Sequence, residues 1–254
     1  MPVEIVPESE IWFAAKIGFL RKSLWNEFFA KGSSRWRRRQ WLFFQRRSYF
    51  FRHPSSLARD VIVLNPKNLM VRELVGEDIS SPPFAPQITH DEIMARSLLV
   101  LTKSGLIQDY KVEAELKRES IGQRKVHDAS EKLKFPDAIV RTTSAGTFVR
   151  LAVELELTRK NPKRYRQIIG SYATKPDLNR VIFIARSNLI FENLRAAMRE
   201  TYYPDWERPI GFCHLDDWIR DPANAAIHFN DGVTTLAKIA GVQVSDGAEK
   251  AKAA

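Results

Sequence analysis

The chain has 254 residues, of which 44% are hydrophobic and 28% charged, so it is globular and long enough for one large or two small cores. It has no apolar run of about twenty residues, and its first residues are acidic and unlike a signal peptide, so we expect a soluble, cytoplasmic protein with no membrane partner. The single cysteine, Cys213, excludes an intramolecular disulfide and a cysteine-rich zinc site.

The net charge of +10 is concentrated in the first third of the chain. Residues 1–76 hold fourteen Lys and Arg against six Asp and Glu. A positive field on one module is typical of a protein that binds a polyanion such as nucleic acid.

Three helices are predicted at the start, over 8–20, 23–30 and 35–47, with Ser34 capping the third. In the third helix the spacing turns Trp36 and Phe43 inward and leaves most arginines outward. Two short strands, 49–52 and 61–64, then form a predicted hairpin.

Three helices and a hairpin are the outline of a winged helix, whose third helix enters the major groove of DNA. The alternative is that the arginines only form a solvated helix face. The cluster has one sign and no interleaved acids, which favours DNA binding. The predicted contacts from this module are Arg35, Arg37, Arg38, Arg39, Arg46, Arg47 and Arg52.

A proline-rich linker is predicted over 77–88, after a domain of residues 1–76. A second domain then covers 89–242, opening with a capping box at Thr89 to Glu92. A mobile loop that includes His127 is expected over 119–134, and a disordered tail over 243–254.

The chemistry is concentrated in a second predicted hairpin, with strands over 138–143 and 147–157. Alternation along the second strand places Glu154 and Glu156 on one face, while Asp137 begins the first strand. Two carboxylates in so apolar a strand are costly unless a cation lies between them, so we expect a Mg²⁺ or Mn²⁺ site with Lys160 beside it. The alternative is that both glutamates line the wet face of a two-sided hairpin.

A basic helix follows, with Asn161 as its cap and Pro162 in its first turn. Its apolar residues, Tyr165, Ile168, Ile169 and Tyr172, recur at helical spacing and should face the sheet. Lys163 and Arg164 oppose the helix dipole, which suggests that they bind a phosphodiester. Further strands are predicted over 180–185 and 210–214, and helices over 190–203 and from Trp218.

Pro136-Asp137 followed by Glu154-Leu155-Glu156 resembles the PD-(D/E)XK nuclease superfamily, with Glu156 at the position of the usual lysine. Within it, the layout is similar to plasmid replication-relaxation proteins and MobC-type mobilisation relaxases. The resemblance implies an α+β or α/β chain, in which a winged helix precedes a restriction-endonuclease-like mixed sheet flanked by helices. It also implies a further site acid, for which we choose Glu113.

From the resemblance we expect a metal-dependent endonuclease that nicks double-stranded plasmid DNA, with other relaxosome or replication proteins as partners. No His-x-His cluster lies near Tyr165 or Tyr172, so a covalent tyrosine step is not supported. Two alternatives stay open: an inactive DNA-binding regulator with a nuclease-like fold, and an RNA-directed nuclease.

Overall fold

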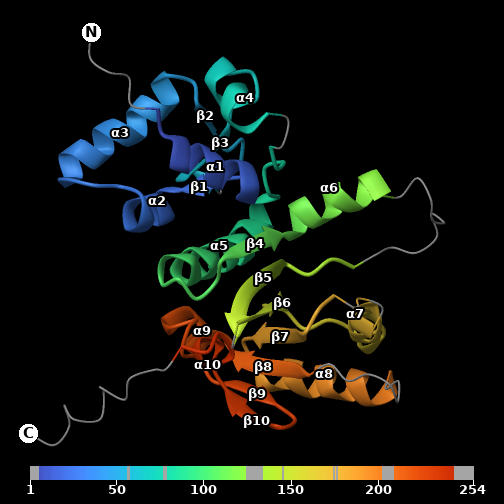
Figure 1. The fold of residues 1–254 in the computed structure, drawn as a ribbon. Helices are drawn as coiled ribbons and strands as arrows, with labels where there is room; N and C mark the ends of the chain where they lie inside the picture. Colours follow the sequence, from blue (N-terminus) through green and yellow to red (C-terminus); the bar gives the residue numbers. More distant parts are fainter. Residues whose placement is uncertain are drawn as a thin grey trace, which may run out of the picture. The chain divides into compact units, whose positions relative to one another are not determined.

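The structure is a computed structural model that describes residues 6–55, 58–76, 79–123, 134–144, 146–173, 175, 177–201 and 209–242. These residues form a mixed α+β protein with a three-stranded and a seven-stranded sheet (Figure 1). None of the helices within these ranges is long and apolar enough to span a membrane. The predicted tail, 243–254, and His127 in the predicted loop lie outside the described residues.

The chain divides into two compact units, neither of them a single stretch of sequence. Unit 1 comprises Met1–Arg96 and Val112–His127, and unit 2 comprises Ser97–Lys111 and Asp128–Ala254.

Unit 1 begins with three short helices and a small antiparallel sheet in the order β1-β3-β2. Its elements are α1 (Glu8–Ile17), β1 (Leu20–Arg21), α2 (Lys22–Phe28), α3 (Ser34–Arg46), β2 (Phe50–Arg52), β3 (Val61–Leu64), α4 (Leu69–Val75), a 3-10 turn at Ala85–Gln87, the start of α5 (Ile88–Lys103) and α6 (Glu113–Gln123). The predicted hairpin of β2 and β3 is confirmed.

Aromatic packing holds α2 and α3 of unit 1 together. The Trp25 ring lies 5.3 Å from that of Trp41 and 5.7 Å from that of Phe44, measured between centroids. The first helix ends at Gly18, whose φ of 96° is left-handed and whose missing Cβ would lie 2.6 Å from the Ser81 carbonyl oxygen. A side chain there would be both strained and obstructed.

Two predictions about the helices of unit 1 are wrong in detail. Ser33, not Ser34, caps α3, because its hydroxyl accepts the Trp36 main-chain N–H at 3.3 Å. Trp36 is 48% exposed, and the buried residues of this helix are Trp41 and Phe44.

Two boundaries elsewhere in unit 1 also differ from the prediction. Thr89 lies inside α5, which begins at Ile88, so it does not open a capping box. The predicted loop 119–134 starts within α6, which continues to Gln123.

The large sheet has the strand order β10-β9-β8-β7-β6-β5-β4. Its strands are β4 (Asp109–Val112), β5 (Ala138–Ser144), β6 (Thr147–Glu156), β7 (Arg180–Ala185), β8 (Ile210–His214), β9 (Ile227–Phe229) and β10 (Gly232–Thr234). The predicted β5–β6 hairpin is confirmed as an antiparallel pair, and β6, β7 and β8 are parallel.

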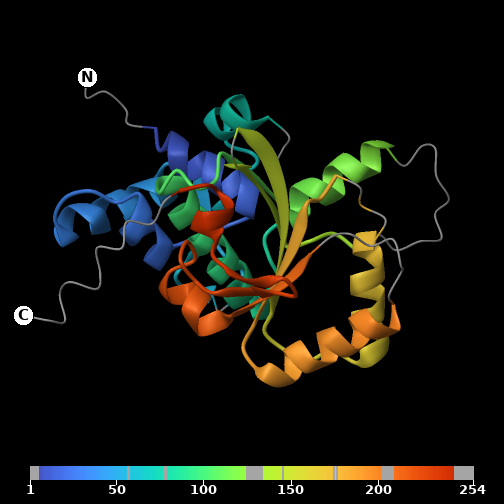
Figure 2. The same ribbon diagram turned by 60° about the horizontal axis from the view of Figure 1, so that its bottom comes forward.

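Helices cover both faces of the sheet in unit 2 (Figure 2). The helices α7 (Pro162–Ala173) and α8 (Asn188–Glu200) pack together on one side, while α9 (Leu215–Arg220) lies on the other and α10 (Leu236–Ile239) ends the described chain. Trp218 of α9 donates from its indole to the Ser97 hydroxyl at 2.8 Å. Strand β6 therefore has neighbours on both edges and both faces.

Candidate functional site

Glu154 and Glu156 lie on a central strand, where both faces are covered. In β6 they pair in register with Phe183 and Ala185 of β7, and each glutamate is only 1% exposed. The alternative of a wet hairpin face is therefore wrong. Both carboxylates are buried in an apolar sheet, and the surrounding side chains must balance their charge.

Helix α7 covers the face of β6 that carries the two glutamates. Its start is fixed by Asn161, whose side-chain oxygen accepts the Arg164 N–H at 2.8 Å, which confirms the predicted cap. The four residues predicted to face the sheet, Tyr165, Ile168, Ile169 and Tyr172, are each 0% exposed. The Tyr172 ring meets Phe183 of β7 edge-on at 6.2 Å between centroids.

Both oxygens of Glu154 have partners. The Tyr172 hydroxyl donates to Oε1, and the Lys134 ammonium donates to Oε2 at 3.0 Å. Burial and then the negative charge of Asp137 raise the pKa of Glu154 to about 8, although Lys134 and Tyr172 oppose the shift. Near neutral pH the protonated form of this carboxyl group is therefore favoured.

Glu156 has one occupied oxygen and one that lacks a partner. The Lys160 ammonium donates to Oε2, while Oε1 is buried and makes no hydrogen bond. Burial raises the pKa of Glu156, Lys160 opposes that rise, and the charge of Asp137 adds to it. A buried carboxylate oxygen without a donor is costly, and it is available to a ligand.

Asp137 immediately precedes β5 and is half-buried beside β6. Its Oδ2 accepts the Leu155 main-chain N–H at 2.7 Å, which fixes the side chain against the strand that carries both glutamates. Because its charge raises the pKa of Glu154 and of Glu156, the three acids act on one another electrostatically. The sequence prediction that they belong together is consistent with this placement.

Two lysines that the sequence reasoning missed also belong to this cluster. Lys134 pairs with Glu154, and Lys175 donates to the Lys134 carbonyl oxygen at 2.6 Å. The Lys175 ammonium lies 5.0 Å from the Tyr172 ring centroid and 5.8 Å from that of Phe135, and burial lowers its pKa. Lys134 stands two residues before Pro136, and that proximity to the motif was the available signal.

Neither tyrosine of α7 is placed as a nucleophile. Burial and the charge of Glu154 raise the pKa of Tyr172 well above its usual value, so its hydroxyl stays protonated and donates. Burial also raises the pKa of Tyr165, whose oxygen accepts the Lys160 main-chain N–H at 3.1 Å. Both hydroxyl groups organise the cluster.

Glu113, the further acid expected from the resemblance, belongs to unit 1. It opens α6, and its carboxylate pairs with Lys117 at 2.9 Å. An i,i+4 pair of this kind on a helix surface is a common structural contact.

The predicted DNA-binding residues occupy the outer side of α3 and the start of α7. Arg35, Arg38, Arg39 and Arg46 are exposed, and so are Lys163 and Arg164. Arg35, Arg39 and Arg46 recur at helical spacing and form one row along α3.

Three further arginines from that prediction, Arg37, Arg47 and Arg52, lie outside this row. Arg37 is half-buried, and its Nε makes no hydrogen bond. Arg47 lies over the Phe43 ring at 5.5 Å, and Arg52 donates to Gln45 at 3.1 Å. Arg47 and Arg52 are nevertheless exposed, like the row on α3.

Glu154 and Glu156 carry carboxylate oxygens, which are hard donors of the type that Mg²⁺ prefers. Within the described ranges, no group of three or more His, Cys, Asp or Glu is arranged to hold a metal ion. Mg²⁺ is commonly held by one or two carboxylates, with water and substrate phosphates completing its shell. Glu154 and Glu156 are carboxylates of this kind, and Oε1 of Glu156 has no hydrogen-bond partner.

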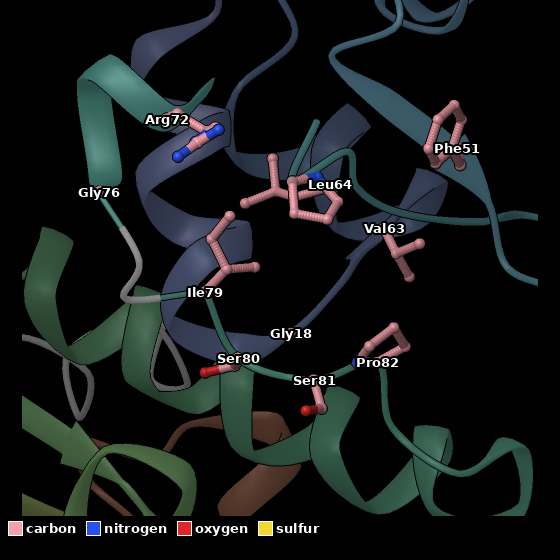
Figure 3. A pocket seen from close by; sticks show the side chains of 11 residues that line it. Gly18, Phe51, Val63, Leu64, Arg72, Gly76, Ile79, Ser80, Ser81 and Pro82 are labelled. Carbon is pink, nitrogen blue, oxygen red and sulfur yellow. The ribbon is translucent and has the colours of Figure 1, made fainter. Parts of the chain in front are cut away.

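A hollow in unit 1, shown in Figure 3, is lined by other kinds of residue. It has a volume of about 610 Å³ and lies between α1, β3, α4 and the 79–82 segment. Its lining is mostly apolar, including Phe51, Val63 and Leu64, with Arg72 as its charged residue. The lining contains no carboxylate, histidine or cysteine.

Comparison of the chain with family models, with curated proteins and with solved structures found no match. Function must therefore be inferred from the site itself.

Proposed function

We propose that the protein is a divalent-cation-dependent endonuclease that nicks double-stranded DNA. The observation that carries the proposal is the buried pair Glu154 and Glu156, with Asp137 beside it and with Glu156 Oε1 lacking a partner. Buried carboxylates with an unused oxygen are chemically suited to a cation.

Glu154 and Glu156 would hold Mg²⁺ or Mn²⁺, and Asp137 would add to the negative potential. When bound, such an ion polarises a phosphodiester and makes bound water more acidic.

The residues around the carboxylates supply positive charge for a phosphate. Lys134 and Lys160 already donate to the two glutamates, so their ammonium groups can stabilise charge that develops on a phosphate bound there. Lys163 and Arg164, exposed at the start of α7, can bind neighbouring phosphates. Lys134 precedes β5 and Lys160 follows β6, so the hairpin brings these two ammonium groups to the glutamates.

In unit 1, the arginine row on α3 supports binding to duplex DNA. Three exposed arginines on one helix face bring a row of positive charge to the phosphate backbone. With the antiparallel β2–β3 hairpin, the arrangement is compatible with a winged helix. A plasmid origin or transfer site, nicked once for replication or mobilisation, is the substrate we propose.

The second candidate is a DNA-binding regulator whose nuclease-like domain is inactive. It is favoured by one observation, which is that Lys134 and Lys160 already neutralise Glu154 and Glu156. Buried glutamates balanced in this way can be purely structural.

Nicking of supercoiled plasmid in Mg²⁺ or Mn²⁺ separates the two candidates. We expect the wild type to convert supercoiled plasmid to the nicked circle, and the isosteric variant Glu156→Gln to be slower by about a hundredfold or more. Filter binding on the same samples should show unchanged DNA affinity. Binding without nicking by the wild type would favour the regulator, and equal nicking by the variant would exclude this site.

A further inference from the structure

Lys134 and Lys160 act as counter-ions for the buried carboxylates. Each ammonium pairs with Oε2 of one glutamate, and each glutamate is 1% exposed. Removing one partner of such a buried pair is strongly destabilising, because it leaves a desolvated charge without compensation. In the free protein, therefore, the two lysines have a role that a cation would otherwise fill.

The two lysines and a divalent cation would bring the same positive charge to the glutamates. Two ammonium groups carry the same charge as one divalent ion, so either set can balance Glu154 and Glu156 when both are ionised. Both sets together would leave an excess positive charge in a region of low dielectric, where repulsion between like charges is strong. Binding of the ion and pairing of the lysines therefore oppose one another.

The lysines and the glutamates are held differently in the fold. The Lys134 ammonium also donates to the Phe135 carbonyl oxygen at 2.8 Å. Lys134 and Lys160 lie outside the helices and strands, and their side chains are 15% and 34% exposed. The main chain of Lys160 is held through its N–H bond to Tyr165, so only its side chain needs to turn. Glu154 and Glu156 are fixed in β6, between β5 and β7.

We propose that Lys134 and Lys160 exchange partners when the site is used, leaving the glutamates as a divalent cation binds and turning to a phosphate of the DNA. This inference rests on the proposed function, which supplies the cation and the phosphate. It makes binding of the ion a requirement for presenting both ammonium groups to the DNA.

Acetylation by an N-hydroxysuccinimide ester, measured lysine by lysine with mass spectrometry, tests the exchange in the full-length protein. An ammonium paired with a buried carboxylate is shielded from the reagent, and one that turns into solvent is accessible to it. We expect saturating Mg²⁺ to raise acetylation of Lys134 and Lys160 several-fold. Adding a duplex oligonucleotide with Mg²⁺ should lower both rates again. Lys238, exposed on α10, is the reference and should keep one rate under all conditions.

Glu156→Gln is the positive control. It removes the buried charge and leaves Lys160, whose side chain is 34% exposed, free to be solvated without any Mg²⁺, and circular dichroism checks that the fold is intact. Unchanged rates for Lys134 and Lys160 in saturating Mg²⁺, with Lys160 released in the control, would overturn the exchange. The plasmid assay is read separately. Nicking without a change in acetylation rejects the exchange alone, whereas Mg²⁺-dependent acetylation without nicking supports the exchange and rejects the nuclease.

Discussion

At the residue scale, the buried carboxyl group of Glu154 links the site to the pH dependence of stability. Folding raises its pKa to about 8, whereas an exposed glutamate titrates near about 4.3. Between these values the folded protein holds more protons than the unfolded chain. Its free energy of unfolding therefore falls as pH rises through this window.

We expect Glu154→Gln to flatten this dependence. The variant cannot ionise at this position, so its stability should fall less between pH 5 and pH 8, by roughly 1.4 kcal/mol for each pH unit. Urea unfolding at several pH values measures the slope. Glu192→Gln, on the exposed side of α8, is the matched control and should keep the wild-type slope. Equal slopes for Glu154→Gln and the wild type would contradict the burial argument.

The acidic residues of the site were predictable from sequence, and most of their partners were not. Asp137, Glu154 and Glu156 stand out because carboxylates interrupt apolar strands, and strand alternation puts the two glutamates on one face. Lys134 and Lys175 give no such signal, because charged residues in polar segments are ordinary. Their roles depend on how the chain folds back over β6.

At the element scale, burial of α7 explains why its side chains position the site. Ile168 is 0% exposed and sits between Tyr165 and Tyr172 on the covered face. Ile168→Ala should lower the free energy of unfolding by about 2–5 kcal/mol, through lost burial and the cavity left behind. Gln167→Ala, on the exposed face, should change it by less than about 0.5 kcal/mol. A comparable loss from both variants in urea unfolding would show that α7 does not pack as described.

The arginine row on α3 makes a separate prediction about salt. Replacing Arg35, Arg39 and Arg46 by alanine should reduce the slope of log affinity against log salt for duplex DNA by about three, since each phosphate contact contributes about 0.9. The matched control replaces Arg59, Lys67 and Arg72, which are exposed elsewhere in unit 1 and carry the same charge. Fluorescence anisotropy over a salt series measures the slope for each triple variant. Equal slopes for the two triple variants would mean that α3 is not the contact surface.

Elements with strong patterns were predicted well, and short ones were missed. The bounds of β7 and β8 match the predicted apolar runs, since buried parallel strands read as continuous hydrophobic sequence. Helix α4 and the strands β9 and β10 span too few residues to show a period, so they were not predicted. The prediction of which face of α3 is buried was wrong. Trp36 and Trp41 are both candidates for burial, and only packing against Trp25 decides between them.

At the scale of the whole molecule, the family resemblance implied an α+β or α/β chain, and the structure is mixed α+β with a seven-stranded mixed sheet. The interleaving of the two units could not be predicted from the sequence. Helix α5 runs from unit 1 into unit 2, and α6 belongs to unit 1 again. Such returns depend on contacts between distant segments. The division still gives each unit its own chemistry, with the arginine row in unit 1 and the carboxylates in unit 2.

Binding of Mn²⁺, followed by the loss of the free-ion signal in electron paramagnetic resonance, tests the cation site most directly. We expect the wild type to bind Mn²⁺ saturably, and the double variant Glu154→Gln, Glu156→Gln to lose that binding while keeping its fold. No saturable binding by the wild type, or equal binding by the double variant, would contradict a cation site on β6.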